Sequence, residues 1–265
     1  MPEPALLSDP SDPAVQRLAD LAKPSRGSVR TAIVEDQEPL VQALRAGVRF
    51  VEVYGESTRE LPADVAALCA EHGVPVRLVE PAVLTKVFRS EKRPKVFGVA
   101  NVPAPARFSA LADGTGDVLV LDGVKIVGNI GAIVRTAVGL GARGVVLVDS
   151  DLPTIADRRL VRASRGHVFS VPVLLETRER VTRWLTDAGL RVVDVDMDGS
   201  LSPESLGALD EDVALLLGAE KTGASDALQG LATDTVSVPI DSRVESLNVS
   251  VVAGIVLYAR TRRGH

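Results

Sequence analysis

The feature that most constrains the fold is a regular alternation of short apolar runs and helical segments after residue 116. The apolar runs are rich in Val and Leu on both faces, which is typical of strands buried in a parallel sheet. They cover 117–121, 144–148, 171–174, 191–196, 213–217 and 235–239. Helical segments are predicted at 129–140, 155–165, 178–188 and 224–232, with a last helix from about 247 to 262. This part of the chain is therefore predicted to be an α/β domain built on a parallel sheet.

The first hundred residues contain a smaller set of elements. A helix is predicted over 11–23, because Asp12 and Pro13 suit the cap and the first turn of a helix. A second helix is predicted over 62–71, and strands over 49–54, 76–79 and 95–101. This alternation indicates a small α/β/α layer domain.

A proline-rich stretch divides the two parts. Residues 102–107 read Val-Pro-Ala-Pro-Ala-Arg, and prolines continue neither a helix nor a central strand. The predicted division is a first domain over 1–105, a linker over 106–116 and a second domain over 117–265.

The composition excludes several classes of protein. A hydrophobic fraction of 46% and a charged fraction of 25% are those of an ordinary globular protein. The longest apolar runs fall far short of the roughly 20 residues that a membrane helix needs. Cys69 is the only cysteine, and His72, His167 and His265 lack metal-ligand spacing, so neither an internal disulfide nor a metal is expected. We expect a cytoplasmic protein with no membrane partner.

The glycine-rich loops do not match the common nucleotide-binding patterns. The spacing in 123–131 does not give the dinucleotide fingerprint, and 218–225 lacks the Lys-Ser/Thr pair of a P-loop. The chain also has no G-x-S-x-G sequence, which excludes the serine-hydrolase elbow. Whatever chemistry occurs at the strand ends must use other residues.

The net charge of −5 conceals two basic clusters. Residues 77–95 hold six basic residues against two acidic ones, and 158–165 hold four arginines and no acid. Phosphate groups respond to the local field within about 8–10 Å, so such clusters suit a nucleic-acid partner despite the overall charge. The alternative is a solvated face whose charges pair with acids elsewhere in the chain.

Three segments at predicted strand ends combine polar residues with apolar surroundings. In 128–137, Asn129 is placed to cap a helix, and Arg135 lies about one and two-thirds turns further on. In 217–223, an apolar strand runs into Gly218, and Glu220 is placed to pair with Arg135. Each segment also has a structural explanation, as a sheet-end salt bridge or as a plain strand–turn–helix connection.

The third segment, 238–250, joins the last strand to the last helix. Either Ser246 or Asn248 opens that helix, whose apolar residues indicate that it is buried. Polar groups near a buried helix start are costly unless they are paired, which suggests a site. Ser246 acting as a simple cap is the alternative.

Together the three segments resemble the signature motifs of the SpoU branch of the SPOUT methyltransferases. The order N-I-G-A-I-V-R-T, L-G-A-E-K-T-G and V-P-I-x₅-S-L-N-V-S is the same. The resemblance covers about 117–262 and implies a deep trefoil knot, a rare exception to the rule against threaded chains. It also implies that S-adenosylmethionine donates a methyl group to a ribose 2′-hydroxyl in RNA.

The first part resembles the thiopeptide-antibiotic resistance methyltransferases. The similar segments are 11–17, 23–26 and 53–55. This resemblance implies an N-terminal RNA-binding domain similar to a ribosomal protein, and an adenosine ribose of 23S ribosomal RNA as the substrate. Two alternatives remain: the same chemistry on another ribosomal or transfer RNA site, and a non-catalytic RNA-binding or ribosome-assembly protein.

The family resemblance also assigns roles to single residues. The catalytic set it implies is Arg135, Glu220, Ser246, Asn248 and Asn129, with Arg135 orienting the ribose or its phosphate. Three knot loops would hold the cofactor, and the residues expected there are Val195, Gly218, Val238, Ile240 and Leu247. The RNA contacts expected from the basic clusters are Arg26, Arg89, Lys92, Arg93 and Arg165. A homodimer through the knot domain is expected, with Arg165 reaching toward the partner's site.

Overall fold

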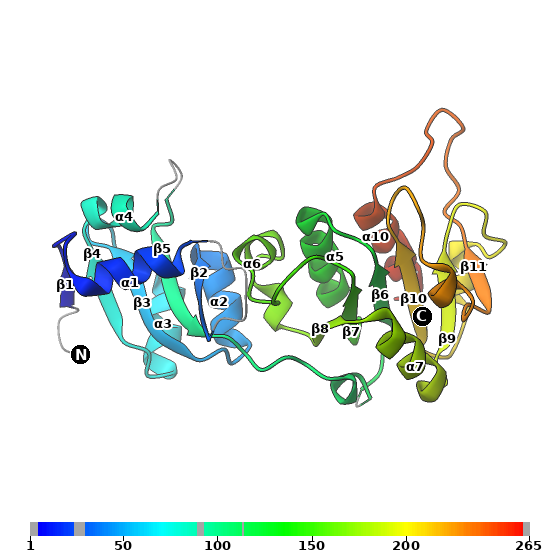
Figure 1. Cartoon of the computed structure of the whole chain (residues 1–265), viewed down its shortest axis with the longest axis horizontal. Coiled ribbons are helices and arrows are strands. Elements are labelled where there is room, and N and C mark those ends of the chain that lie inside the picture. The colour runs from blue at the N-terminus through cyan, green and yellow to red at the C-terminus, as the bar shows by residue number, and fades with distance from the viewer. Residues whose placement is uncertain (1–4, 24–29, 89–92, 113, 262–265) are drawn as a thin grey trace. The chain divides into compact units, whose positions relative to one another are not determined.

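The structure is a computed structural model that describes residues 5–23, 30–88, 93–112 and 114–261. It divides into two compact units (Figure 1). The first unit is Met1–Ala104 together with Ala156–Ser170, and the second is Pro105–Ile155 together with Val171–His265. The predicted domains differ from these units in one respect, because 156–170 belongs with the first unit. The domain boundaries themselves stay a prediction.

The first unit is built on a five-stranded mixed sheet in the order β1-β4-β3-β5-β2. Strands β1, β4 and β3 are parallel, and β5 runs antiparallel to both β3 and β2. The strands are β1 (Ala5–Leu7), β2 (Thr31–Glu35), β3 (Phe50–Glu56), β4 (Val76–Val79) and β5 (Val96–Asn101). The helices are α1 (Pro13–Leu21), α2 (Gln37–Arg45), α3 (Ala63–Glu71) and α4 (Pro81–Val87).

Helices cover both faces of this sheet. On β5, Phe97 and Val99 pack in one core with α1 and α4. Between them, Gly98 faces the other side, where an added Cβ would lie 2.9 Å from Cδ1 of Leu40 on α2. The second face is completed by α3, which packs on α2. Two segments from later in the chain also belong here: α6 (Arg158–Ala163) packs on β2, and the short 3-10 helix His167–Phe169 packs on α2. The predicted α/β/α layer arrangement is confirmed.

The second unit is built on a six-stranded sheet in which every strand pair is parallel. The strand order is β11-β9-β10-β6-β7-β8. The strands are β6 (Val118–Asp122), β7 (Gly144–Val148), β8 (Val173–Glu176), β9 (Arg191–Val195), β10 (Val213–Gly218) and β11 (Asp234–Val236). Each corresponds to a predicted strand, although β8 begins two residues later than expected and β11 ends three residues earlier. The predicted parallel sheet is thus confirmed.

The helices of this unit are α5 (Val127–Gly139), α7 (Arg178–Ala188), α8 (Pro203–Gly207), α9 (Asp226–Gln229) and α10 (Val249–Arg260), and a 3-10 turn covers Phe108–Leu111. Of these helices, α7 has the predicted bounds and α5 begins two residues earlier than predicted, whereas α9 and α10 are shorter than predicted and α8 was not predicted. Side chains from the central strands are fully buried between the helices, for example Val120, Val146 and Leu216. The sheet therefore carries the core, and its strand ends are held in fixed positions.

Helix α10 is fixed to the sheet at its far end by a buried arginine. Arg260 is 4% exposed, and its guanidinium donates two hydrogen bonds to Asp117, at 2.8 and 3.1 Å. It also donates to the carbonyls of Leu206, Leu209 and Glu211 at 2.6–2.8 Å. A buried charge with all donors occupied in this way locks the position of the helix. The N-terminus of α10, which carries Asn248, is placed accordingly.

Candidate active site

The strand order brings the three signature segments to one edge of the sheet. In a parallel sheet the carboxyl ends of all strands lie at the same edge, where α/β proteins bind their ligands. β10 lies between β9 and β6, so the loop after β10 is a neighbour of the loops after both. The segments 128–137 and 217–223 follow β6 and β10, respectively, and 238–250 follows β11 at the edge of the sheet.

Three of the predicted catalytic residues form one hydrogen-bond chain. The amide nitrogen of Asn248 donates to Oδ1 of Asn129 at 3.1 Å. The amide nitrogen of Asn129 in turn donates to Oε1 of Glu220 at 3.0 Å. The backbone N–H of Val249 lies 3.4 Å from the same Glu220 oxygen. One residue from each signature segment is therefore held in a single network.

The start of α10 explains why Asn248 is fixed. Asn248 is the N-cap, and its Oδ1 accepts hydrogen bonds from the backbone N–H of Ser250 at 2.8 Å and from its hydroxyl at 2.6 Å. Such a cap satisfies donors that the first turn of a helix leaves free. Of the two cap residues considered from the sequence, Asn248 is the one found. Ser246 is exposed and makes no side-chain hydrogen bond within the described residues.

Two details of the first segment were predicted wrongly. Helix α5 begins at Val127 after the cap residue Ile126, so Asn129 lies inside the first turn and does not cap the helix. Arg135 does not pair with Glu220: it is exposed and has no hydrogen-bond or ion-pair partner within 5–261 where the structure is described. At 3.6 residues per turn, six residues rotate a side chain about 120° away from Asn129. The two side chains consequently lie on different faces of α5.

The turn after β10 requires a glycine at position 218. An added Cβ would lie 1.9 Å from the carbonyl carbon of Gly223 and 2.0 Å from the nitrogen of Ala224. The loop closes on itself here, because the N–H of Ala219 donates to the carbonyl of Gly223 at 3.1 Å and Gly223 donates back at 2.9 Å. A side chain at Gly218 does not fit, and this tight loop is what presents Glu220.

The residues expected to hold the cofactor lie in loops at the ends of three adjacent strands. Val195 ends β9, Gly218 ends β10, and Val238 follows β11. These three are half-buried, as are Ile240 and Leu247, whereas Val244 and Met197 are 46% and 61% exposed. Partly covered apolar side chains of this kind can contact the purine ring of S-adenosylmethionine.

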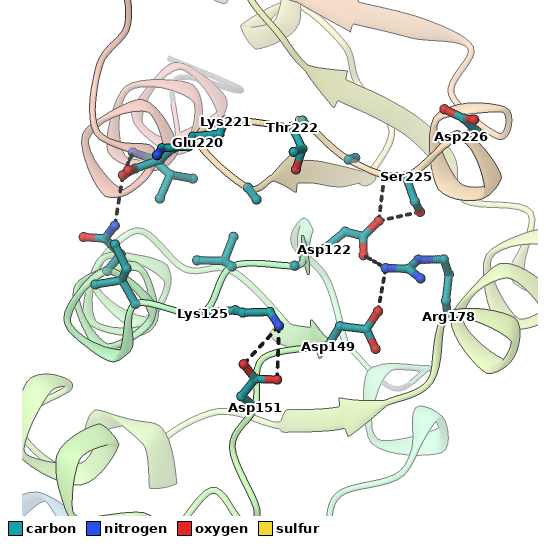
Figure 2. A pocket seen from close by; sticks show the side chains of 18 residues that line it. Asp122, Lys125, Asp149, Asp151, Arg178, Glu220, Lys221, Thr222, Ser225 and Asp226 are labelled. Carbon is teal, nitrogen blue, oxygen red and sulfur yellow. Dashed lines mark hydrogen bonds and ion pairs between the residues drawn. The ribbon is translucent and has the colours of Figure 1, made fainter.

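A pocket of about 900 Å³ adjoins the Asn129–Glu220 network, in the size range of ligand sites. Segments after three strands line it: 122–126 after β6, the loop after β7, and 219–226 after β10. Figure 2 shows Glu220, Lys221 and Thr222 on one side and Asp122, Lys125 and Asp151 on the other. Of the residues that line this pocket, the predicted catalytic set includes Asn129 and Glu220.

The innermost group of the pocket is a buried carboxylate that the sequence analysis missed. Asp122 ends β6, is 2% exposed, and accepts a hydrogen bond from Arg178 of α7 at 2.8 Å (Figure 2). Its other oxygen accepts from the backbone N–H of Ser225 at 2.8 Å and from the Ser225 hydroxyl at 2.5 Å. The same Arg178 nitrogen lies 2.6 Å from Asp149. These contacts tie the loop after β10 to β6 and α7. The signal in the sequence that could have revealed it is a single acid at the end of an apolar strand.

Burial and hydrogen bonding act on Asp122 in opposite directions. Burial by itself raises the pKa of the Asp122 carboxyl, but hydrogen bonds from Arg178 and Ser225 stabilise the charged form and bring the pKa below its usual value. Asp194 on β9 is different, since burial raises its pKa and the amide of Gln229 only partly offsets this. The carboxylate under the pocket is thus ionised at neutral pH.

Most of the predicted RNA contacts cannot be placed. Arg26, Arg89 and Lys92 lie outside the described residues. Arg93 donates a hydrogen bond to the hydroxyl of Thr85, and Arg165 forms an ion pair with Glu38 at 3.1 Å. The whole 158–165 cluster pairs with acids: Arg158 with Glu35, Arg159 with Asp157, and Arg162 with Asp36. For this cluster the paired arrangement, which was the alternative, is the one found.

The described residues contain neither a candidate metal site nor a helix that could span a membrane. Within the described parts of the chain, no group of three or more His, Cys, Asp or Glu side chains is arranged to hold a metal ion. In the same residues, no helix combines the length and the apolar character needed to cross a membrane.

Family comparisons divide the chain at the place where its two sets of elements meet. Residues 4–114 match the family "Thiostrepton-resistance methylase, N terminus", and 117–258 match the "SpoU rRNA Methylase family". The matched second region contains the parallel sheet and the Asn129–Glu220–Asn248 network. The chain therefore belongs to the SpoU rRNA methylase family.

Individual relatives are similar over almost the whole length. A 23S rRNA (adenosine(1067)-2′-O)-methyltransferase of Streptomyces laurentii is 55% identical, over 97% of this chain and 96% of the relative. The enzyme of the same description from Streptomyces azureus is 49% identical over the same shares. Among solved structures, the SpoU methyltransferase AviRb from Streptomyces viridochromogenes, in complex with the cofactor AdoMet, gives a TM-score of 0.76 at 25% identity. That match covers 95% of this chain and 98% of AviRb. The cofactor of this family is S-adenosylmethionine.

Proposed function

We propose that this chain transfers the methyl group of S-adenosylmethionine to the 2′-hydroxyl of an adenosine ribose in 23S ribosomal RNA. We further infer that this modification protects the ribosome against thiopeptide antibiotics. The observation that carries the proposal is the Asn248–Asn129–Glu220 network, which joins the three signature segments at the strand ends. The choice of RNA rests on the relatives named for 23S rRNA, at 55% and 49% identity.

The network has the properties of a device that orients a hydroxyl. A ribose hydroxyl is a weak nucleophile, so holding it in line with the methyl group and assisting its deprotonation supply most of the catalysis. When bound, S-adenosylmethionine supplies an activated methyl group. Asn129 and Asn248 have both amide atoms engaged, and Glu220 is held through Oε1 alone. Its Oε2 makes no hydrogen bond to any described residue, which leaves it able to accept one from the ribose.

Arg135 contributes by position rather than as a base. A guanidinium does not lose its proton in proteins, since its pKa exceeds about 12. The exposed Arg135 side chain has no partner in the described part of the chain, so it is available to bind the ribose or a neighbouring phosphate. Its fork of donors matches a phosphate in a way that an ammonium does not.

The decisive experiment maps 2′-O-methyl groups on ribosomal RNA. The chain is expressed in a bacterium that lacks the modification, beside an Asn129→Ala variant as the control. We expect one new 2′-O-methyladenosine in 23S RNA, and growth in the presence of thiostrepton, with the chain alone. A new methyl group on transfer RNA or at another ribosomal position would show that the substrate is a different RNA site. If no RNA gains a methyl group, the proposed methyltransferase activity is wrong.

We also infer that the active protein is a homodimer that associates through α5 and α10, which pack on each other. Val251, Ile255 and Tyr258 recur at helical spacing on α10, and Val251 and Tyr258 are 49% and 54% exposed. An apolar helix face left open beside an unpartnered arginine suits a second copy of this chain. Within this arrangement we expect the trefoil knot that the family resemblance implies, and we place the protein in the cytoplasm with its ribosomal substrate.

The dimer is tested by sedimentation of the purified chain. The dimer proposal predicts twice the monomer mass at micromolar concentration, and a monomer for Tyr258→Glu. Asp187→Glu, at an exposed site on α7, is the matched control and should sediment like the unmodified chain. A monomeric unmodified chain would contradict the dimer and leave the methyl transfer untouched.

RNA capture is proposed for the basic residues of the first unit, among them Arg26, Arg89, Lys92, Arg93 and Arg165. Neutralising phosphates releases counterions, so the logarithm of the binding constant should fall linearly as the logarithm of the salt concentration rises. Filter binding of a 23S transcript between 50 and 300 mM KCl measures this slope. A Kd that does not change with salt would rule out an electrostatic footprint.

A further inference from the structure

The pocket beside the network has no occupant in the reaction as described so far. We expect S-adenosylmethionine at the loops after β9, β10 and β11, whereas the pocket is lined by segments after β6, β7 and β10. The loop that carries Glu220 lies between the two regions. A substrate whose hydroxyl reacts at Glu220 must therefore extend away from the cofactor, and the pocket is the space open on that side.

We propose that this pocket receives the base of the target nucleotide and that Asp151 reads its exocyclic amino group. The inference rests on the proposed ribose 2′-hydroxyl transfer. In a nucleotide, the base is bonded to the carbon next to the one that carries the 2′-hydroxyl. Asn129 and Glu220 both belong to the pocket lining. A ribose 2′-hydroxyl bound at these two residues therefore places the attached base no further from the pocket than the width of the ribose ring. A volume of about 900 Å³ holds a purine with room for its sugar.

The charge of the lining favours a base over a phosphate. It contains five carboxylates and three cationic side chains, a formal charge of −2: Asp122, Asp149, Asp151, Glu220 and Asp226 against Lys125, Arg178 and Lys221. Such a lining repels a phosphate and attracts hydrogen-bond donors such as an amino group. The walls include Val124, Ile126, Ala219 and Ala224, which offer apolar contact to the ring.

Asp151 is an exposed carboxylate of the lining that lies beside a cationic donor, Lys125. Asp122 is buried under Arg178 and Ser225, and Asp149 is engaged by Arg178 at 2.6 Å. Asp151 is 68% exposed, and its one side-chain partner among the described residues is Lys125, itself 57% exposed, at 3.0 Å (Figure 2). Exposed pairs of this kind are weak and open readily. Asp151 and Lys125 then offer an acceptor beside a donor, and adenine presents its 6-amino donor beside a ring-nitrogen acceptor.

The backbone at Asp151 gives clean variants. Its φ is +59°, in the left-handed region that Gly, Asn and Asp tolerate. Asp151→Gly removes the carboxylate without strain, and Asp151→Asn keeps an oxygen that can accept from an amino group. Asp187→Asn on α7, exposed and outside the pocket, is the matched control for loss of one negative charge.

The experiment replaces the target adenosine in a 23S transcript by purine riboside, which lacks only the 6-amino group. Single-turnover methylation and filter-binding affinity with S-adenosylhomocysteine are measured for both transcripts. The unmodified chain and Asp187→Asn should prefer adenosine about tenfold in both measurements, the discrimination expected of a base-edge hydrogen bond. Asp151→Gly should bring that ratio close to one, and Asp151→Asn should give an intermediate value.

The possible outcomes distinguish an error in the base-pocket proposal from an error in the proposed methyl transfer. If the unmodified chain binds and methylates both transcripts equally well, the base-pocket proposal is wrong, whereas the proposed methyl transfer is unaffected. Tighter binding of both transcripts by Asp151→Gly, with an unchanged ratio, shows that a phosphate occupies the pocket and also overturns the proposal. Failure to methylate any transcript refutes the proposed function, and the binding ratio still decides the pocket in that case.

Discussion

The side chain of Asp122 is expected to be important for stability. It is buried, charged, and hydrogen-bonded to two elements that are distant in the sequence, Arg178 of α7 and Ser225 before α9. Without this carboxylate the backbone N–H of Ser225 loses its acceptor, whereas Arg178 keeps its ion pair with Asp149. Hydrogen bonds to a charged group contribute roughly 1.5–3 kcal/mol. Asp122→Ala should therefore lower the free energy of unfolding by about 3 kcal/mol, as measured by urea unfolding monitored through Trp184 fluorescence.

The pH dependence of that effect has a definite sign. The pKa of Asp122 is lower in the folded chain than its usual 3.8, so the native state binds fewer protons than the unfolded state. The stabilisation is complete above about pH 4 and is lost as the pH falls through the depressed native value. The unfolding curves of the original chain and Asp122→Ala should hence converge below pH 4. Asp20→Asn, at an exposed surface pair, should leave the unfolding midpoint unchanged. A gap between the original chain and Asp122→Ala that does not narrow as the pH falls below 3.8 contradicts this account.

Cys69 illustrates how burial controls reactivity. It is 2% exposed on α3, and burial raises the pKa of its thiol to about 11. Since the thiolate is the reactive form, less than one thiol in a hundred is ionised at pH 8. We expect Ellman's reagent to react with the folded chain only over hours at pH 8, and within seconds in 6 M guanidinium chloride. Immediate stoichiometric reaction of the folded chain would show that the thiol is open.

Arg135 should matter for turnover and not for stability. It is exposed on α5 and has no partner among the described residues, so Arg135→Lys should change the free energy of unfolding by less than about 0.5 kcal/mol. If its forked guanidinium orients the substrate, kcat should fall by about 100-fold, because lysine cannot supply two parallel donors. Near-normal turnover of Arg135→Lys would show that a single positive charge is sufficient.

At the scale of an element, the conformation of the loop after β10 depends on a glycine, Gly218, because a side chain does not fit there. Gly218→Ala would place a Cβ about 2 Å from the backbone of Gly223 and Ala224, a contact that cannot be accommodated without moving the loop. Glu220 should then leave the network, and heat of S-adenosylmethionine binding should be lost in calorimetry. Gly139→Ala is the control, because an added Cβ on that part of α5 meets nothing within 4 Å. Unchanged binding by Gly218→Ala would show that the loop can rearrange freely.

Elements that carry their own signal in the sequence were predicted, and those that depend on distant partners were not. The central strands of the second unit, β6, β7 and β10, are apolar on both faces, which identifies them without reference to the fold. β1 has three residues, of which only Leu7 is buried, and it exists because β4 offers a parallel partner at Arg77–Val79. β2 similarly depends on β5, about 70 positions away. Helices α2 and α4 in the first unit were also missed.

The residues of the candidate site likewise differ in whether the sequence alone could predict them. Asn129, Glu220 and Asn248 could be named in advance, because the motifs specify residue types at fixed spacing. The predicted pairing of Arg135 with Glu220 was wrong, because a spacing of one and two-thirds turns points the Arg135 side chain about 120° away from Asn129. The Asp122–Arg178 pair spans 56 positions and exists only once β6 and α7 have packed, so no local pattern contains it. Side-chain pairs of this kind need the fold before they can be predicted.

At the scale of the whole molecule, the first unit is not a continuous stretch of chain. Residues 156–170 belong to it, and they supply α6 on β2 and the 3-10 helix on α2. The fit is close: at Gly166 an added Cβ would lie 2.6 Å from the carbonyl oxygen of Pro39. Leu160, Val161 and Val168 are at most 2% exposed in this arrangement. A fragment that ends at residue 104 therefore lacks part of the surface that completes its own core.

This organisation predicts how fragments will behave. Residues 1–104 alone should bind the dye ANS and unfold without a sharp transition, because apolar surface on α2 and β2 is left uncovered. Joining 156–170 to residue 104 through a flexible linker should restore a cooperative thermal transition and abolish dye binding. The control carries the same linker and Leu160→Asp with Val168→Asp, which place charges at fully buried positions and should behave like 1–104. If 1–104 already melts cooperatively, the segment 156–170 is dispensable and the first unit folds from its own residues.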